Sequence, residues 1–171
     1  MSEQNKQVVL TFIEAMGKGD AAAAAPCLAP DAFTLAKGFG KFAGVRTHDT
    51  ILATIAAFSK LVPNGMHPDI HSVTAEGDRV VVEFDGNATL CNGESYCNEY
   101  CMVFSLRDGK IKQVNEYFCT ILADKVLFPL VAAEGYPSSL GFWGFNAHFH
   151  TPVDGAASTT GAIMEPIARA I

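Results

Sequence analysis

The sequence predicts an α+β fold in which helices cover one face of a curved sheet. Two stretches carry apolar residues at helical spacing, residues 3–17 and 51–62. Four stretches of alternating character follow the second helix, at residues 70–75, 80–90, 94–106 and 110–120. Helices followed by a run of antiparallel strands are typical of α+β proteins, because the helices then pack together against the sheet.

The first half of the chain divides into three helices and one short strand. Asp20 is expected to cap a second helix through the alanine run, which Pro26 ends. A short strand at residues 33–35 and a glycine-rich loop come next. The third helix is expected to begin at Thr47 or Asp49.

Two dipeptides, Asn92-Gly93 and Asp108-Gly109, join the last three strands and suit two-residue hairpin turns. Closing these hairpins at residues 91 and 94 and at 107 and 110 fixes which side chains share a face. One face then collects Val82, Phe84, Ala88, Glu99, Cys101, Val103, Val114, Glu116 and Phe118. The opposite face collects Glu83, Asp85, Asn87, Asn98, Tyr100, Tyr117 and Cys119.

An apolar face that carries carboxylates indicates a small-molecule pocket containing a base. Glu116 is the first candidate for that base, because burial among apolar side chains raises a carboxyl pKa towards neutrality. Glu99 is the second candidate. A β-bulge would shift the register and bring Asn98 and Tyr100 to the pocket face instead, so the assignment of faces stays open.

Composition excludes several classes of partner. The 171 residues suit one domain with a sizeable core, with 49% hydrophobic residues and a net charge of −6. An acidic chain without a basic patch argues against nucleic acid and anionic membranes. No apolar run reaches the roughly 20 residues of a membrane span, and no signal peptide opens the sequence, so a cytoplasmic protein is expected.

From residue 124 the sequence changes to an aromatic-rich extension. We therefore divide the chain into a domain at 1–123 and an extension at 124–171, which would pack on the domain or on a partner subunit. Trp143 and His148 could reach the pocket from there. His148 and His150 lack a third ligand nearby, and no C-x-x-C motif occurs, so no metal and no cofactor are expected.

Several segments between residues 5 and 122 resemble the nuclear transport factor 2-like superfamily, in its ketosteroid isomerase and SnoaL-like polyketide cyclase branch. The segments are FIEAMGKGDAAAAAPCLAPDAF, GDRVVVEF and SYCNEYCMVFSLRDGKIKQVNEYFCT. The resemblance implies a cone-shaped curved antiparallel sheet packed on N-terminal helices (a cystatin-like α+β barrel) with a pocket inside the cone. It also implies a homodimer formed through the outer sheet face.

Departures from the family patterns narrow the chemistry. The three positions that resemble the catalytic residues of ketosteroid isomerases hold Phe12, Ala36 and Cys101, which argues against steroid isomerisation by that mechanism. Related epoxide hydrolases pair an arginine with carboxylates on facing strands. The candidate strand here offers Glu99 and Cys101 and no arginine, which argues against that mechanism as well. In SnoaL-like cyclases a strand carboxylate acts as acid and base, and Glu116 stands at a comparable place.

The sequence therefore predicts a protein that binds a small apolar, ring-containing ligand. As an enzyme it would be a cofactor-free isomerase, cyclase or dehydratase with Glu116 and Glu99 as catalytic candidates; the alternative is a non-catalytic ligand-binding or dimerisation module. The candidate substrate-binding residues are Phe12, Phe33, Phe58, Phe84, Asn98, Tyr100, Cys101, Phe118, Trp143 and His148.

Overall fold

The computed structural model describes residues 2–133 of the chain. The elements, in order, are α1 (Ser2–Lys18), α2 (Ala21–Ala24), the 3-10 helix η1 (Ala25–Cys27), β1 (Leu28–Ala36), β2 (Gly44–Thr47), α3 (His48–Leu61), β3 (His67–Glu76), β4 (Arg79–Thr89), β5 (Ser95–Arg107), β6 (Lys110–Phe118), α4 (Thr120–Val126) and α5 (Phe128–Ala133). The predicted α+β class and the N-terminal helices are confirmed.

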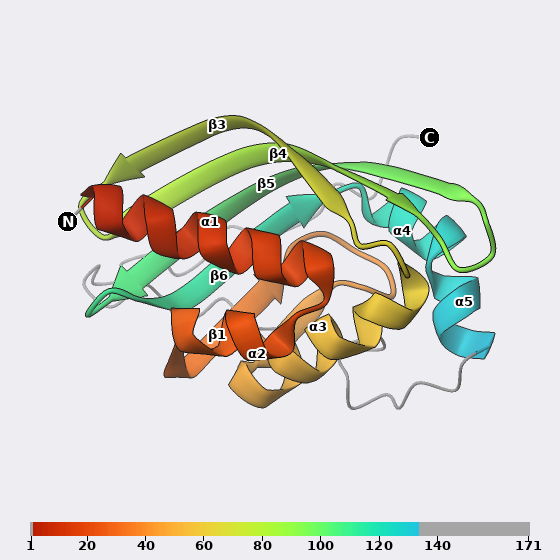
Figure 1. The fold of residues 1–171 in the computed structure, drawn as a ribbon, viewed down its shortest axis with the longest axis horizontal. Helices are drawn as coiled ribbons and strands as arrows, with labels where there is room; N and C mark the ends of the chain where they lie inside the picture. Colours follow the sequence, from red (N-terminus) through yellow and green to blue (C-terminus); the bar gives the residue numbers. More distant parts are fainter. Residues whose placement is uncertain (1, 134–171) are drawn as a thin grey trace, which may run out of the picture.

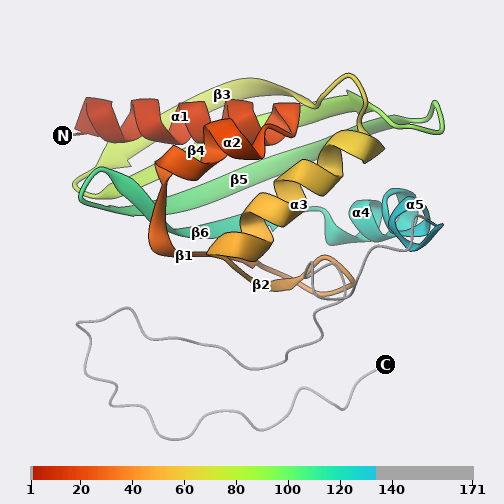
Figure 2. The same ribbon diagram turned by 60° about the horizontal axis from the view of Figure 1, so that its bottom comes forward.

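One bent sheet of six strands, in the order β2-β1-β6-β5-β4-β3, carries the helices α1, α2 and α3 on one face (Figures 1 and 2). The sheet is mixed rather than antiparallel, because β1 pairs with β6 in parallel. Among the described residues β2 and β3 each pair with one neighbour, so the sheet stays open and does not close into a barrel. The short helices α4 and α5 lie at one end of the molecule (Figure 1).

The apolar stripe of α1 faces the sheet and forms much of the core. Val9, Phe12 and Ile13 are at most 2% exposed, and the Phe12 ring meets Phe104 of β5 edge-on at 6.2 Å between centroids. This packing, more than helix propensity, holds α1 in place. It also directs the middle of the helix at the inner face of the sheet.

Gly17 lets the end of α1 approach the loop that leads into β3. A side chain there would come within 2.5 Å of the Met66 carbonyl oxygen, and the Gly17 carbonyl accepts a hydrogen bond of 2.7 Å from the Met66 amide. Only a residue without Cβ fits this contact. The contact fixes Met66 at the inner face.

The register of β5 differs by one residue from the register expected from the turns. The first hairpin pairs Thr89 with Ser95 across a longer loop, and a bulge separates Ser105 from Leu106 in the pairing of β5 with β6. As a result Tyr100 pairs with Phe118, and Cys101 pairs with Tyr117. The expectation that Glu99 and Cys101 share the face of Glu116 is therefore wrong.

The inner face of β5 carries Tyr96, Asn98, Tyr100 and Met102 instead, the alternative that the sequence left open. The face of β6 is unaffected by the shift, so Glu116 points inward as expected. A bulge beside a turn is a common source of such errors, because its extra residue leaves no signal in the alternation of the partner strand.

The expected boundary at 123/124 falls inside α4. Ala123, Leu127 and Val131 are all buried in the core of the domain, and the Asp124 carboxylate accepts hydrogen bonds from the Lys41 amide. Whether residues 124–171 form a unit of their own stays a prediction. None of the helices in the described part of the chain is long and apolar enough to cross a membrane.

Candidate functional site

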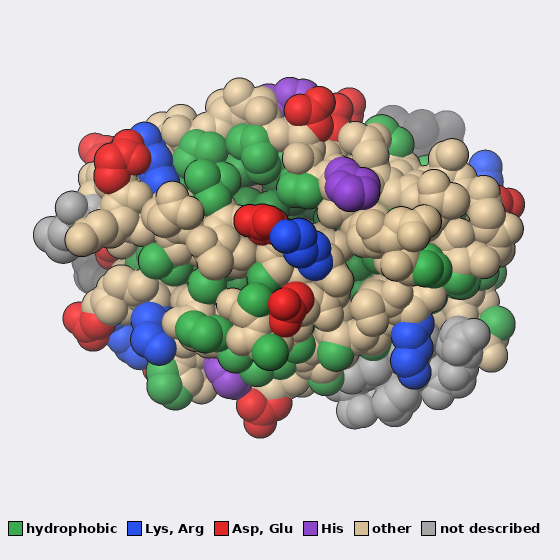
Figure 3. Space-filling view, in the orientation of Figure 1, with side chains coloured by type: hydrophobic (Ala, Val, Ile, Leu, Met, Phe, Trp, Pro, Cys, Tyr) green, Lys and Arg blue, Asp and Glu red, His purple; other side chains and the backbone are tan. Residues whose placement is uncertain are grey.

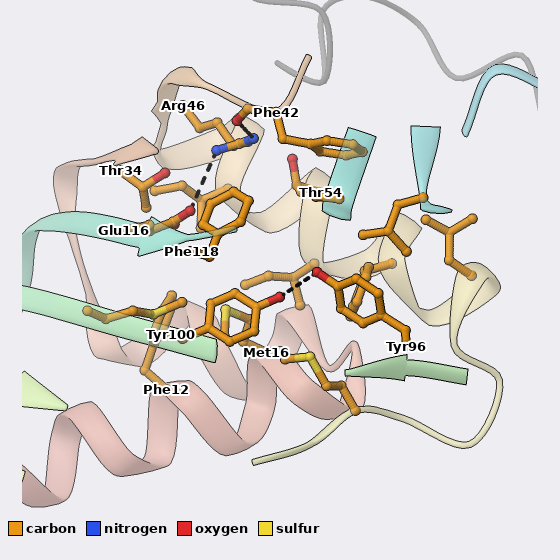
Figure 4. Close-up of a pocket in the computed structure, with 18 residues that line it drawn as sticks. Phe12, Met16, Thr34, Phe42, Arg46, Thr54, Tyr96, Tyr100, Glu116 and Phe118 are labelled. Atoms are coloured by element: carbon orange, nitrogen blue, oxygen red, sulfur yellow. Dashed lines mark hydrogen bonds and ion pairs between the residues drawn. The ribbon is translucent and has the colours of Figure 1, made fainter. Parts of the chain in front are cut away.

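A cavity of about 130 Å³ lies between the helices and the inner face of β5 and β6 (Figure 4). Its wall is apolar apart from a few polar side chains. It is lined by Phe12, Met16, Thr34, Phe42, Arg46, Ile51, Thr54, Ile55, Phe58, Leu61, Met66, Tyr96, Tyr100, Met102, Glu116, Phe118, Ala123 and Leu127. A concave apolar site with a few convergent polar groups is the usual form of a small-molecule site.

Glu116 supplies the carboxylate of this cavity. Its side chain is 18% exposed, and burial raises its pKa above the ordinary value for a glutamate. Two neighbours oppose this rise by favouring the charged form, first the Arg46 guanidinium and then the Thr34 hydroxyl. Burial outweighs both neighbours, so Glu116 exchanges its proton at a higher pH than an exposed glutamate.

Arg46 is the charged partner of Glu116, with 3.7 Å between Nη1 and Oε2. Its side chain is only 7% exposed, and Nη2 donates a 2.8 Å hydrogen bond to the Phe42 carbonyl. Arg46 Nε is buried and lacks a hydrogen-bond partner among the described residues, and the Thr34 hydroxyl is buried beside Glu116. The polar end of the cavity thus presents one carboxylate and two buried groups that are able to donate.

The sheet topology brings these three residues together. Thr34 pairs with Arg46 across β1 and β2, and Ala36 pairs with Glu116 across β1 and β6. Because side chains two apart on a strand share a face, Thr34, Arg46 and Glu116 all point inward from three adjacent strands. Arg46 of β2 therefore faces the carboxylate, whereas the inner face of the candidate strand β5 carries no arginine.

Two tyrosines form a second polar group of the cavity. The Tyr96 and Tyr100 hydroxyl oxygens lie 2.9 Å apart, and Figure 4 shows this pair apart from the Arg46–Glu116 pair within the same cavity. Burial raises the pKa of both hydroxyls, and that of Tyr100 rises well above its usual range. Both tyrosines are therefore protonated near neutral pH.

The structure places the predicted binding residues in three different ways. Four of them, Phe12, Phe58, Tyr100 and Phe118, line the cavity together with Glu116. Two others lie directly behind the wall. Phe84 stacks on Tyr100 at 5.0 Å between ring centroids, and Asn98 donates a hydrogen bond to Tyr96.

The remaining predicted residues do not meet the cavity. Phe33 lies beneath the Lys112 ammonium, 5.5 Å from its ring centroid, and does not line the cavity. Glu99 is exposed on the outer face of β5, and Cys101 lies half-buried on that same face. Trp143 and His148 fall outside the described residues.

Arg46, Thr34 and Tyr96 are the functional groups that sequence reasoning missed. Arg46 follows the glycine-rich loop, in a strand of only four residues. The parallel pairing of β1 with β6 is what places Thr34 and Arg46 beside Glu116, and no local pattern encodes a pairing across 80 or so residues. The described residues contain no group of three or more His, Cys, Asp or Glu side chains able to hold a metal ion.

Comparison with known proteins gives one family match and many structural matches. A family model described as a SnoaL-like domain matches residues 9–114. No curated protein matches the chain closely enough to count as a relative. Solved structures similar to this one number in the hundreds.

Three of these structures show how different the described activities of the similar proteins are. An NTF2-like protein of unknown function from Burkholderia pseudomallei is 23% identical, with a TM-score of 0.63 over 74% of this chain and 98% of its own. An LEH-like epoxide hydrolase of M. tuberculosis is 21% identical, with a TM-score of 0.61 over 78% and 97%. A protein from Jannaschia sp. CCS1, described as a putative SnoaL-like polyketide cyclase, is 16% identical, with a TM-score of 0.59 over 80% of this chain and 95% of its own. At these identities the likeness shows the fold alone.

Proposed function

The chain belongs to the SnoaL-like domain family, and from that premise we propose that it is a cofactor-independent enzyme that moves a proton on a small, apolar, ring-containing ligand. The observation that carries the proposal is Glu116, a carboxylate with a raised pKa in the wall of an apolar cavity. Burial of this kind moves proton exchange by a carboxylate to higher pH, towards the range in which general bases work.

The chemistry begins at a carbon next to a carbonyl group. Glu116 takes a proton from that carbon, and the electron pair of the broken C–H bond moves onto the carbonyl oxygen to form an enolate. Where a C=C bond is conjugated with the enolate, return of the proton to the far carbon of that bond is an isomerisation. Expulsion of hydroxide from the adjacent carbon is a dehydration, and attack of the enolate on a second carbonyl carbon is a cyclisation.

Arg46 tunes this base. Its guanidinium lies 3.7 Å from the carboxylate and holds the Glu116 pKa lower than burial alone would set it. Without it, Glu116 would stay protonated to a higher pH. The Nη2–Phe42 hydrogen bond fixes the guanidinium in this place.

The test uses 2-indanone, a small apolar ketone with two acidic CH₂ groups beside its carbonyl. Proton NMR in D₂O follows the replacement of these hydrogens by deuterium. We expect the wild-type protein to accelerate exchange and Glu116→Gln to lose at least about 100-fold of that acceleration, the usual range for a general base. Glu99→Gln is the matched control, because Glu99 is an exposed glutamate on the neighbouring strand.

Three outcomes separate the possible functions. Exchange that depends on Glu116 supports the proposal. Binding of 2-indanone without exchange would instead support the non-catalytic binding module. Hydrolysis of styrene oxide without exchange would assign Glu116 to the activation of water, for which Arg46 and Thr34 offer additional polar groups.

A further inference from the structure

Asn98, Tyr96 and Tyr100 form a hydrogen-bonded row along the inner side of β5 that ends in the cavity. Asn98 Nδ2 lies 2.9 Å from the Tyr96 hydroxyl oxygen, which in turn lies 2.9 Å from the Tyr100 hydroxyl oxygen. Asn98 and Tyr96 are each 2% exposed. The proton transfer proposed for Glu116 makes no use of this row.

The backbone of Cys119 fixes which way the Asn98 amide points. Its N–H donates to Asn98 Oδ1 at 3.1 Å, and its carbonyl accepts from Nδ2 at 3.1 Å. A backbone N–H only donates and a carbonyl only accepts, so the oxygen and nitrogen of this amide cannot be exchanged. The second Nδ2 proton is therefore directed to Tyr96, and the Tyr96 oxygen must accept it.

The direction of the next hydrogen bond follows from burial. Tyr96 has a single hydroxyl proton, and Asn98 offers it a donor and no acceptor. If Tyr100 donated to Tyr96, the Tyr96 proton would be buried without a partner among the described residues, which costs about 1–3 kcal/mol. If Tyr96 donates to Tyr100, every proton in the row is satisfied except that of Tyr100. Both tyrosines line the cavity, but Tyr96 is only 2% exposed whereas Tyr100 is half-buried, so this direction leaves the free proton on the more accessible tyrosine.

We propose that Tyr100 donates its hydroxyl proton to an oxygen atom of the ligand, in a direction set by Asn98 and Tyr96. Asn98 and Tyr96 are positioning residues in this scheme, and Tyr100 is the residue that touches the ligand. Each hydroxyl accepts one bond and donates the next, so the row polarises the last proton towards the cavity. An oxygen that gains negative charge, such as that of an enolate, is bound most strongly.

Packing holds the Tyr100 ring in a fixed orientation. Phe84 stacks on one face of it with an interplanar angle of 8°, and Phe118 lies 5.6 Å away between ring centroids. Gly86 packs directly against this ring, because a Cβ at that position would lie 2.8 Å from Tyr100 Cε2. The hydroxyl is thus held in place before any ligand binds, and little ordering is needed on binding.

The positions of Tyr100 and Glu116 define the ligand class. Tyr100 pairs with Phe118 and Met102 pairs with Glu116, so Tyr100 and Glu116 are diagonal neighbours on one face of the sheet. A carbonyl oxygen at Tyr100 would bring the adjacent carbon towards Glu116. A cavity of about 130 Å³ is close to one that holds a single aromatic ring, so we infer a cyclic ketone or phenol of one or two rings.

The test compares 2-indanone with indane, which has the same carbon skeleton without the oxygen. Calorimetry gives the Kd of each for the full-length protein. We expect wild type to prefer 2-indanone, and Tyr100→Phe to weaken 2-indanone roughly three- to tenfold while leaving indane within about twofold. Tyr117→Phe is the matched control, a tyrosine that is 46% exposed on the outer face.

Infrared spectroscopy of the bound ketone reports on the hydrogen bond itself. The carbonyl band should lie at a lower wavenumber in the wild-type complex than in an apolar solvent, and Tyr100→Phe should return it to the solvent value. Tyr96→Phe should leave an intermediate shift, because Tyr100 then lacks the donor behind it. If the carbonyl band of Tyr96→Phe is shifted as far as that of wild type, the positioning role is overturned. If the band of Tyr100→Phe is shifted as far as that of wild type, the oxygen site is overturned.

The inference rests on the proposed function only for the position of the reacting carbon, so the two can fail separately. A Tyr100-dependent carbonyl shift without deuterium exchange would refute proton transfer and leave the oxygen site standing. Deuterium exchange that depends on Glu116, with Tyr100→Phe changing neither the Kd nor the carbonyl band, would refute the oxygen site and leave proton transfer standing. Equal affinity of wild type for 2-indanone and indane would also overturn the oxygen site.

Discussion

Glu116 combines two opposing influences in one side chain. Burial among aromatic and aliphatic neighbours disfavours its charge, while Arg46 and Thr34 favour it. The result is a raised pKa, which a solvent-exposed ion pair would not produce. That balance makes Glu116 usable both as a proton acceptor and as a proton donor within one turnover.

The raised pKa makes a prediction about stability. An acid whose pKa is higher in the folded state binds more protons there, so its stabilising contribution is present at low pH and is lost as the pH rises through the unfolded and folded pKa values. Glu116→Gln removes this titration. We expect the variant to be more stable than wild type at pH 8, by about 1.4 kcal/mol for each unit of pKa elevation, and equally stable at pH 4.

Urea unfolding at the two pH values measures this difference, and Glu99→Gln serves as the control. A difference that persists unchanged at pH 4 would show that the substitution acts through packing and not through titration.

Arg46 makes a prediction about the pH dependence of proton transfer. Replacing it by Gln removes the positive charge that lowers the Glu116 pKa, so the carboxylate becomes basic only at higher pH. The ascending limb of the rate of deuterium exchange against pH should move to higher pH in Arg46→Gln. An unmoved limb would mean that the 3.7 Å contact does not influence the base.

Individual site residues differed in how well the sequence predicted them. Glu116 follows from the alternation of β6, which the bulge leaves intact, and Phe12 and Phe58 follow from helical spacing. Tyr100 was assigned to the wrong face because the bulge between Ser105 and Leu106 moves β5 by one residue. Arg46 depends on a strand pairing that no local pattern shows.

The element that determines the site most strongly is β5, because its register decides what lines the cavity. Its inner face carries the hydrogen-bonded row of Asn98, Tyr96 and Tyr100, and its outer face carries Glu99 and Cys101. A shift by one residue would exchange the two sets. The bulge next to the β5–β6 turn therefore decides which residues of β5 line the cavity.

A substitution in β4 tests how tightly this face is packed. Gly86→Ala would place a methyl group 2.7 Å from Met66 Sδ and 2.8 Å from the Tyr100 ring. We expect a loss of about 1–3 kcal/mol in the free energy of unfolding, together with weaker binding of 2-indanone as the ring is displaced. Asn87→Ala, at the next and exposed position, should change neither quantity by more than about 0.5 kcal/mol.

Unfolding in urea and calorimetry provide the two measurements. If Gly86→Ala is destabilised but binds 2-indanone as tightly as wild type, the prediction is wrong. Displacement of the Tyr100 ring would then not weaken ligand binding.

At the level of the whole molecule, local patterns were sufficient for the class and for the order of the main elements, but they did not predict β2, α4 or α5. Periodicity located α1, α3 and the four strands from β3 to β6 close to their observed bounds. The parallel contact between β1 and β6 was not predicted, since it joins segments about 80 residues apart through no shared turn. That contact makes the sheet mixed and completes the polar end of the cavity.

The outer face of the sheet makes a prediction about assembly. Among the described residues no helix covers this face, where Val81, Val103 and Cys101 lie half-buried beside the exposed Tyr117. We propose that a second copy of the chain packs there about a twofold axis. Light scattering after gel filtration should show a dimer for wild type and a monomer for Val103→Lys, with Ile121→Lys, at an 80% exposed apolar position on α4, as the control.

A monomeric wild-type protein at micromolar concentration would contradict this arrangement. A dimer that survives Val103→Lys would place the contact elsewhere on the surface. On the opposite, helical face, basic and acidic side chains are interspersed (Figure 3).

The central claim is that one ligand meets Glu116 and Tyr100 at once, and a crystal structure with 2-indanone tests it most directly. We expect the ring in the cavity, the carbonyl oxygen about 2.7–2.8 Å from the Tyr100 hydroxyl and a CH₂ carbon facing the Glu116 carboxylate. A ketone bound with its oxygen at Arg46, or density only outside the cavity, would contradict the account.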